Sequence, residues 1–589
     1  MREADVRKRY VRAGVLGGSL LCLSVYLTLV SAQGVPSSLT GSVTSKAEGL
    51  MEGVVVIAQR EDSSVLTAVT TDASGQYRFP RNRVEPGKYT IAIRAAGYML
   101  PGTGPTLVEV GSREPSRLDL ALRESSRDEL AHQMTSVDWW NSMPGTDRQK
   151  ELLVRTTVNC GFCHEMERVM RSRHTADQFL SVIARMSTYA ADNSSACGTR
   201  SALECDATTS GRVQVQRKQQ PVETLSADDR ELAQYLASVN LSGGRTTWDF
   251  PLKPMPRPKG RGTRAVVTVF PVPRQPSVIH DLAVDQQGNV WWGDSGWGYL
   301  GKFEPKTGTF SEIKAPQHWP DPEPGTKRIV GIQDVEVDAS GRVWAVVGFL
   351  GKKGLAHFDP KTEKWAEFDM PAPVWAFLPS FHKGQRDTTW TSGQILEPGE
   401  PPQFTAFRLN AELGRVDVTH PIKTATAFCY QVSRDADDNF LCNDFMGSNI
   451  VMIDVETGEN TFYPTPTPKA APRRGRFDDE GRLYWFAEFW GDKIGLFDQS
   501  TKSIREFAYS TKYMSAYAAA PDQRGEGWGS STGSDRVVRV NPETGEMTEY
   551  LMPVYYDARK VVVDPSTPTP TIWLPNKNLS QLIRIEPQD

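Results

Sequence analysis

Residues 282–292 read LAVDQQGNVWW, and this pattern recurs through the C-terminal half of the chain. Each copy has alternating residues, an Asp, a turn and a second apolar run that contains an aromatic residue. Later copies read VEVDASGRVWA, VSRDADDNFLC and GRFDDEGRLYW, and weaker copies follow near the end of the sequence. The repeat aspartates are Asp285, Asp338, Asp435, Asp478, Asp522 and Asp564. A recurring unit of this length is typical of repeat folds such as propellers.

The spacing of the aspartates gives the number of units. The intervals are 53, 97, 43, 44 and 42 residues, and Trp390 in TTWTSGQ marks a further unit inside the longest interval. Each unit continues with a second hairpin, such as KFEPKTGTFSEI, so we expect four short strands per unit. The sequence therefore predicts a seven-bladed β-propeller over residues 265–589. The segment VVTVFPVP, residues 266–273, is expected to supply the missing outer strand of the last blade and to close the ring.

These repeats resemble the streptogramin B (virginiamycin B) lyase family, whose propellers have seven blades built from similar units. In that family, catalysis is ascribed to a His/Glu cluster with bound Mg²⁺ near the propeller axis, and the histidines come from later blades. Here the last histidine is His420. The resemblance therefore implies the fold, and the lyase cluster has no matching positions in this sequence.

The strongest chemical signal is NCGFCHEM, which contains Cys160, Cys163 and His164. In a C-x-x-C-H motif the two thiols attach haem covalently, and the histidine binds the iron. Helical patterns flank the motif at residues 147–159, 175–190 and 226–241. Residues 123–245 therefore resemble the c-type cytochrome fold, and the resemblance implies haem c as the cofactor.

The sixth iron ligand is left open between three alternatives. Met186 lies on the helix expected after the motif, His174 precedes that helix, and an open position would favour catalysis. Cys197 and Cys205 lie in the following polar loop, where they are expected to form a disulfide after export.

The first part of the chain has the features of an exported protein. Residues 1–32 combine a basic start, a short apolar run and small residues at the end. This pattern predicts a cleaved signal peptide and a periplasmic or secreted protein without a stable membrane span, and the alternative is an uncleaved membrane anchor. Residues 35–122 show the alternation of short strands, resemble the carboxypeptidase regulatory-like domain and imply an accessory β-sandwich. The Pro-rich residues 246–264 predict a linker. The predicted fold class is multidomain: a small β-sandwich, an α-helical c-type cytochrome domain and a seven-bladed β-propeller.

Polar residues recur at one register of the propeller. Five residues before each repeat Asp, the innermost strand is expected to begin, and the residues there form a predicted axial ring: His280, Gln333, Tyr430, Arg473, Tyr517 and Arg559. His280 is the candidate acid/base, because imidazole titrates near neutral pH. The other site candidates are Tyr430, Arg473, Tyr517 and Arg559, and the two arginines would suit a carboxylate or phosphate. The alternative is a water-filled mouth without a dedicated ligand.

Three further polar residues are expected at the same face, and a disulfide is expected within the fourth blade. The second strands of three blades end at Asp294, Asp444 and Glu488. Cys429 and Cys442 are expected at opposing positions on adjacent antiparallel strands of the fourth blade, where a disulfide can form.

The predicted function is that of an exported haem-c-binding electron-transfer protein. A formal net charge of −4 gives no electrostatic footprint for nucleic acid. In the first interpretation the protein is an oxidoreductase whose propeller binds a small-molecule substrate, or a protein that donates or accepts electrons. The alternatives are a lyase-like or carbohydrate-binding propeller with an accessory cytochrome domain, and a non-catalytic cytochrome whose other domains serve in docking.

Overall fold

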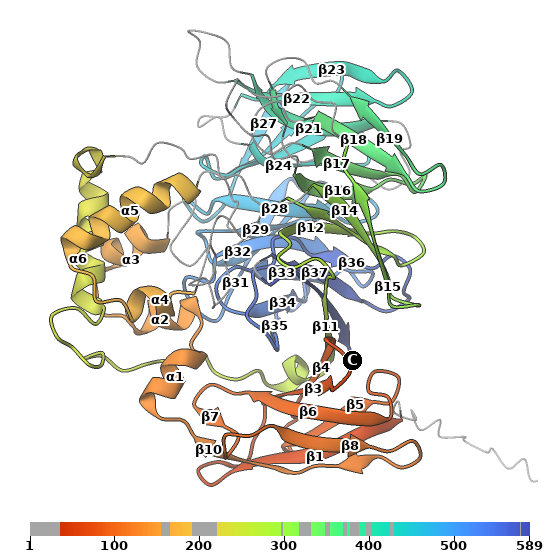
Figure 1. Cartoon of the computed structure of the whole chain (residues 1–589). Helices are drawn as coiled ribbons and strands as arrows, with labels where there is room; N and C mark the ends of the chain where they lie inside the picture. Colours follow the sequence, from red (N-terminus) through yellow and green to blue (C-terminus); the bar gives the residue numbers. More distant parts are fainter. Residues whose placement is uncertain are drawn as a thin grey trace, which may run out of the picture. The chain divides into compact units, whose positions relative to one another are not determined.

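The computed structural model is shown in Figure 1. It describes residues 36–154, 165–190, 221–295, 298–316, 331–347, 354–368, 374–376, 388–395, 403–423, 429–577 and 579–589.

Residues 37–124 form an N-terminal sandwich of short strands. Alternate residues of these strands are buried, so that Leu39, Val56 and Phe79 share one core. The strands are β1 (Ser37–Ser45), β2 (Gly49–Leu50), β3 (Val55–Arg60), β4 (Leu66–Thr70), β5 (Gln76–Pro80), β6 (Gly87–Arg94), β7 (Tyr98–Met99), β8 (Thr106–Val110), β9 (Ser116–Arg117) and β10 (Leu120–Glu124). The sandwich predicted from the alternation is therefore present.

Helices follow the sandwich, and three of them lie where the sequence predicts them. They are α1 (Arg127–Gln133), α2 (Ser136–Ser142), α3 (Asp147–Val154), α4 (Glu167–Met170), α5 (Ala176–Ala190) and α6 (Ala227–Val239). Ser126, Thr135 and Ser226 each begin a helix with a reciprocal capping box, which satisfies the free amides of the first turn. Trp139, Phe179 and Leu236 are buried in one apolar cluster.

The remaining strands form a propeller-like ring of four-stranded sheets, which we call the propeller (Figure 1). The first four sheets are β12 (Ile279–Val284), β13 (Val290–Asp294), β14 (Tyr299–Glu304) and β15 (Thr309–Lys314); β16 (Ile332–Val337), β17 (Val343–Val347), β18 (Gly354–Asp359) and β19 (Lys364–Phe368); β20 (Val374–Ala376), β21 (Thr388–Ile395), β22 (Gln403–Asn410) and β23 (Arg415–Pro421); and β24 (Cys429–Arg434), β25 (Phe440–Asp444), β26 (Asn449–Ile453) and β27 (Asn460–Pro464).

The last three sheets complete the ring. They are β28 (Pro472–Phe477), β29 (Leu483–Glu488), β30 (Lys493–Asp498) and β31 (Ser503–Ala508); β32 (Ala516–Pro521), β33 (Gly527–Ser531), β34 (Arg536–Val540) and β35 (Met547–Leu551); and β36 (Val562–Val563), β37 (Ile572–Asn576) and β38 (Gln581–Pro587) with β11 (Ala265–Pro271) as the outer strand. Strand β11 pairs antiparallel with β38 along its whole length, as the sequence predicts for closure.

The recurring Asp explains the repeat pattern. In the first sheet, Oδ1 of Asp285 accepts the backbone amides of Gln287 and Asn289, and Oδ2 accepts Nε1 of Trp291 at 3.0 Å. The same Asp–Trp hydrogen bond joins Asp338 to Trp344 at 2.9 Å. One carboxylate thus closes the turn and satisfies a buried indole, so these turns are structural.

The sandwich and the propeller share one sheet. Strand β4 pairs antiparallel with the free edge of β11, which extends the last propeller sheet into β3, β6 and β8. The Pro-rich segment before β11 is also held in place, because Met255 N donates to Asp138 Oδ1 at 2.7 Å and Arg257 Nε donates to Glu52 O at 2.9 Å. The segment predicted as a spacer therefore makes specific contacts.

Among the helices of the described ranges, none is both long and apolar enough to cross a bilayer.

We expect Arg94 to be needed for the junction between the sandwich and the propeller. Its guanidinium pairs with buried Asp535 and donates to the carbonyls of Met552 and Val554 at 2.8 and 2.9 Å. Arg94→Met should lower the free energy of unfolding by about 3–5 kcal/mol, because a buried carboxylate loses its cation. Denaturant unfolding followed by circular dichroism measures this loss.

The control is Arg123→Met, which removes a half-exposed ion pair with Glu129. That change should cost less than about 1 kcal/mol. Equal losses in the two variants would contradict the role of Arg94.

Candidate functional site

The structure brings three of the predicted ring residues into direct contact. Arg473 Nη2 donates to Tyr430 Oη at 2.9 Å, and the hydroxyl of Tyr430 lies 2.6 Å from that of Tyr517. The guanidinium of Arg473 lies 3.9 Å from the centre of the Tyr517 ring and 4.1 Å from that of Phe489. Arg473 is thus enclosed by aromatic rings, an arrangement that favours a cation.

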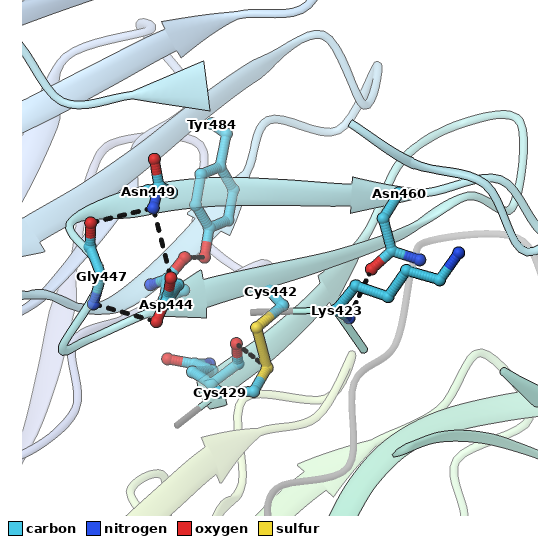
Figure 2. The surroundings of a disulfide bond; sticks show 10 residues. Lys423, Cys429, Cys442, Asp444, Gly447, Asn449, Asn460 and Tyr484 are labelled. Atoms are coloured by element: carbon cyan, nitrogen blue, oxygen red, sulfur yellow. Dashed lines mark hydrogen bonds between the residues drawn. A yellow bond between two sulfur atoms is a disulfide. The ribbon is translucent and has the colours of Figure 1, made fainter. Parts of the chain in front are cut away.

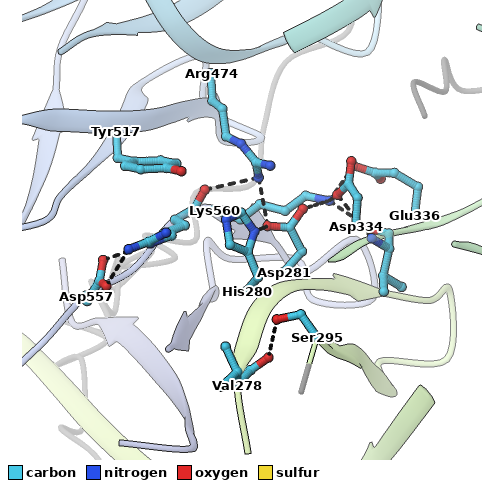
Figure 3. A network of polar contacts seen from close by, with 12 residues as sticks. Val278, His280, Asp281, Ser295, Asp334, Glu336, Arg474, Tyr517, Asp557 and Lys560 are labelled. Carbon is cyan, nitrogen blue, oxygen red and sulfur yellow. Dashed lines mark hydrogen bonds and ion pairs between the residues drawn. The ribbon is translucent and has the colours of Figure 1, made fainter. Parts of the chain in front are cut away.

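The guanidinium of Arg559 lies 5.6 Å from the centre of the Tyr517 ring, and His280 belongs to the polar network of Figure 3. Arg559 pairs with Asp557 at 3.1 Å. His280 Nδ1 lies 2.8 Å from Asp281 Oδ1, and Arg474 Nη1 reaches the same oxygen at 2.7 Å. Because Arg474 also donates to the carbonyl of Arg559 at 3.1 Å, the network joins three sheets of the propeller.

A second set of charged residues surrounds Lys560. Its Nζ lies 2.6 Å from Glu336 Oε1, 3.4 Å from Asp334 Oδ1 and 4.0 Å from Asp281 Oδ2. The sequence analysis missed Asp281, Asp334, Arg474 and Lys560, although each follows a ring residue directly. A charged residue next to the ring position, repeated in four units, was the available signal.

β-Bulges explain why neighbouring residues meet at the axis. The pairing register shifts between Ile279 and Asp281 in β12, and between Pro472 and Gly475 in β28. Equivalent shifts occur at the starts of β16, β24 and β32. A bulge releases a residue from the alternation of the ladder and turns its side chain. The ring residues of these five strands are the bulged ones.

The protonation states at the axis differ from the sequence-based prediction. Burial and the positive charge of Arg474 lower the pKa of His280 well below its ordinary value. His280 therefore stays neutral at pH 7, and its proposed exchange of a proton near neutral pH is not supported. Burial and the carboxylate of Asp281 raise the pKa of Asp334 to about 8, so Asp334 is the group of this network that titrates near neutrality.

The axis itself offers little space. A cavity of about 30 Å³ lies against Glu336, Gln431, Arg474 and Lys560. A cavity of this size holds one or two water molecules. We call the residues described above the axial network: Tyr430, Arg473, Tyr517, His280, Asp281, Asp334, Glu336, Arg474, Asp557, Arg559 and Lys560. Most of its charges face an opposite charge, which makes the axial network a rigid scaffold between the sheets.

The three acidic residues at the ends of the second strands have different surroundings. Asp294 accepts Ser277 Oγ at 2.6 Å, and Asp444 accepts the amide of Gly447 at 3.0 Å, so both hold loops. Glu488 is fully buried, and neither of its oxygens accepts a hydrogen bond from a described residue. Burial, reinforced by the nearby carboxylate of Glu506, raises the pKa of Glu488 to about 9.

A cleft of about 430 Å³ lies between α3 and the propeller, and we call it the interface cleft. Its lining is Asp147, Glu151 and Val154 of α3, Thr467, residues 489–493 and residues 508–513 with Ser515. Gly491 separates the cleft from Glu488, because a Cβ at Gly491 would lie 2.5 Å from Glu488 Oε2. The cleft has the volume of a small-molecule site.

The interface cleft and the axial network share one wall. Phe489 lines the cleft, and its ring contacts the guanidinium of Arg473 at 4.1 Å. The adjacent Trp490 packs on Phe445, whose ring lies 5.5 Å from that of Tyr430. Helix α2 contacts the same face, since Val137 N donates to Gly533 O at 3.0 Å.

The cysteine predictions have different outcomes. Cys429 and Cys442 form a disulfide with a Cα–Cα distance of 5.6 Å (Figure 2). They are not directly opposed as predicted, because a register shift sets Cys429 opposite Asp444 and Cys442 opposite Val432. Cys160, Cys163, His164, Cys197 and Cys205 lie outside the described residues.

The two candidate sixth ligands have different surroundings. Met186 is partly buried on α5, whereas the side chain of His174 is exposed beside Phe179. Within the described ranges, no group of three or more His, Cys, Asp or Glu residues could hold a metal ion.

Comparison with known proteins finds matches for two parts of the chain. Residues 38–123 match the family model of the Carboxypeptidase regulatory-like domain. A streptogramin B lyase structure covers 56% of this chain and 100% of its own, with 17% identity and a TM-score of 0.46. A virginiamycin B lyase from Staphylococcus aureus covers 55% and 99%, with 15% identity and a TM-score of 0.45. No curated protein matches the sequence.

We expect Glu488→Gln to stabilise the protein increasingly as the pH rises. The unfolded carboxyl ionises near 4.5, whereas the folded pKa is about 9, so above pH 4.5 folding must take up a proton. The contribution of the protonated Glu488 carboxyl to the free energy of unfolding is complete below pH 4.5 and is lost as the pH rises toward 9. The gain in free energy of unfolding should be about 2–4 kcal/mol larger at pH 8 than at pH 5.

Denaturant unfolding at both pH values measures the difference. The control is Glu543→Gln at an exposed position, which should change stability equally at pH 5 and pH 8. A gain from Glu488→Gln that does not depend on pH would show that the carboxyl is ionised in the folded protein.

Proposed function

We propose that this protein is an exported haem-c electron-transfer protein, and that it is an oxidoreductase whose propeller carries the substrate or partner site. We propose haem c as the cofactor because of the C-x-x-C-H motif and the helices that flank it. Phe489 lines the interface cleft, and its ring contacts Arg473 of the axial network. This is the single observation on which we base a substrate or partner site on the propeller. The N-terminal sequence supports export, because attachment of haem c and disulfides belong outside the cytoplasm.

The residues around the motif fit a haem. The chain enters the motif from Val154 and leaves it through Met166, and both residues are buried in the apolar cluster of the helices. In the same region the indole Nε1 atoms of Trp139 and Trp140 are buried without a hydrogen-bond partner among the described residues. Buried donors of this kind are suited to the carboxylates of a bound group.

Each residue has a distinct role in this proposal. Cys160 and Cys163 would hold the haem, His164 would bind its iron, and Met186 is the favoured sixth ligand because it is partly buried on α5. A bound haem c supplies one-electron oxidation and reduction. The chain itself holds the helices against the propeller: Asn141 Nδ2 donates to the carbonyl of Lys512 at 3.0 Å.

Contacts between α3 and the propeller support the same arrangement. Lys150 Nζ lies 5.8 Å from the centre of the Tyr513 ring, and Val154 lines the interface cleft six residues before Cys160. A ligand in the cleft would thus lie next to the helix that leads into the motif. Arg473 of the axial network packs against the ring of Phe489, which stabilises this residue of the cleft lining.

We expect the double variant Cys160→Ala/Cys163→Ala to abolish covalent attachment of haem. Each thiol would form one of the two thioether bonds, and a covalently attached haem survives denaturing electrophoresis. Haem staining of the gel and a reduced-minus-oxidised spectrum measure the attachment. Absence of staining in the wild-type protein, purified from the periplasm of a host that attaches haem c, would rule out the proposed function.

We expect Met186→Ala to change the ligation of the iron without releasing the haem. Thioether ligation gives ferric haem a weak charge-transfer absorption band, which should disappear in the variant. His174→Ala is the control and should leave the band unchanged, since His174 is exposed. The opposite pattern would assign the ligand to His174.

A further inference from the structure

The apolar core of the helices continues into the propeller. Trp139, Leu153 and Leu236 of the helices belong to the same cluster of buried residues as Leu496 and Val538 of the propeller. Within the described ranges, the helices therefore share their core with the fifth and sixth propeller sheets instead of closing a separate one. A group that these helices enclose also faces the propeller.

The helix that leads into the haem motif runs along the interface cleft. Asp147, Glu151 and Val154 line the cleft, and their spacing places them on one face of α3 up to its last residue. Cys160 follows Val154 by six residues. An extended chain covers about 3.5 Å per residue at most, so the Cα atom of Cys160 lies within about 20 Å of that of Val154.

The residues that follow the motif are also anchored beside the propeller. The amide of Met166, three residues after Cys163, donates to Ser136 Oγ at 3.1 Å. Ser136 begins α2, and the amide of the next residue, Val137, donates to Gly533 O at 3.0 Å. The chain thus enters the motif at the lining of the cleft and leaves it at a helix that touches the propeller.

The propeller side of the cleft offers ordered aromatic side chains. Phe489 and Tyr513 belong to the lining. The amide of Phe489 donates to Ala471 O at 3.0 Å, and the amide of Tyr513 donates to Asp492 Oδ2 at 2.7 Å. A lining that is already ordered binds a group without the entropic cost of fixing a loop. The porphyrin ring of a haem is flat and apolar, so its edge suits such a lining.

Three lysines gather at the cleft from separate segments of the chain. Burial lowers the pKa of Lys150, Asp147 opposes this shift, and the positive charges of Lys253 and Lys512 add to it, so the three lysines lie near one another. Lys512 itself lines the cleft. None of the three forms an ion pair with a carboxylate of the described residues. The two propionates at one edge of a haem would supply the missing negative charge.

We propose that the propeller completes the haem pocket: the interface cleft holds the propionate edge of the haem, beside Lys150 and Lys512. This inference rests on the proposed function, because it requires a haem bound to Cys160 and Cys163. It gives the propeller a role that the motif alone does not imply, since residues far along the chain then set the charge around the haem. The reduction potential of the haem reports this charge directly.

The test places charges in the cleft and measures the reduction potential of the holoprotein. Thr511 lines the cleft and is partly exposed. Ferric haem carries one more positive charge than ferrous haem, so Thr511→Glu should lower the potential and Thr511→Lys should raise it. Lys512→Gln removes a cation and should also lower the potential. A redox titration followed by the absorption bands of the haem measures each shift.

Thr544→Glu and Thr544→Lys are the matched controls. Thr544 is exposed in the turn after β34, whereas Gly533, which accepts the amide of Val137, lies in the turn before β34. The two turns are at opposite ends of one strand, so charges at residue 544 are remote from the helices and screened by water and salt. They should leave the potential unchanged. Circular dichroism and haem staining verify that each variant is folded and loaded.

The outcomes separate this proposal from the proposed function. Opposite shifts at residue 511 without a shift at residue 544 support the shared haem pocket. A haem-loaded protein whose potential is the same in the wild type and in the Thr511 and Lys512 variants overturns the pocket and leaves the proposed function standing. Equal shifts at residues 511 and 544 also overturn it, because they report only the net charge of the protein.

Two further results are decisive. Lys512 is exposed, so Lys512→Gln answers the question by itself if the Thr511 variants do not fold: a lowered potential supports the pocket, and an unchanged one overturns it. Absence of covalent haem from the wild-type protein rejects the proposed function and this inference together.

Discussion

Strand β11 is hydrogen-bonded along both of its edges, and the architecture depends on this double pairing. On one side it meets β38 and closes the propeller, and on the other it meets β4 of the sandwich. Both edges of a strand that would otherwise be exposed are thereby covered. The ion pair of Arg83 with Glu586 lies across the same junction. The sandwich is thus an extension of the last propeller sheet, which explains why an accessory module has a defined position.

Much of this fold could be predicted from the sequence, because its determinants are local and repeated. The Asp that closes a turn and accepts a Trp indole is visible as a pattern, as are the capping residues of the helices. Closure by residues 266–273 followed from the missing outer strand. The disulfide partners were also identified, although the bulge between Cys429 and Val432 removed their expected opposition.

The candidate site was predicted less completely, for two physical reasons. Strict alternation places one side chain per strand at the axis, whereas a bulge allows both Arg473 and Arg474 to reach it. The interface cleft joins α3 to residues more than 300 positions later, and no local pattern encodes such a meeting. The low pKa of His280 likewise arises from Arg474, a neighbour distant in sequence. The spacing of the repeats identified residues that the structure brings into contact near the axis, but it did not predict the charged residues beside them or the interface cleft.

The pairing of β11 also sets an order for biosynthesis. A ribosome makes β4 and β11 before any of the strands β12 to β38, so the sheet shared with the sandwich can form first. The partner that closes the ring, β38, is made after all the other strands of the propeller. Long-range pairing of this kind is slow, because a large loop must be closed before the contact forms. The propeller is therefore an open arc until β38 has been made, and its final hydrogen bonds form only after the strands of every sheet have been synthesised.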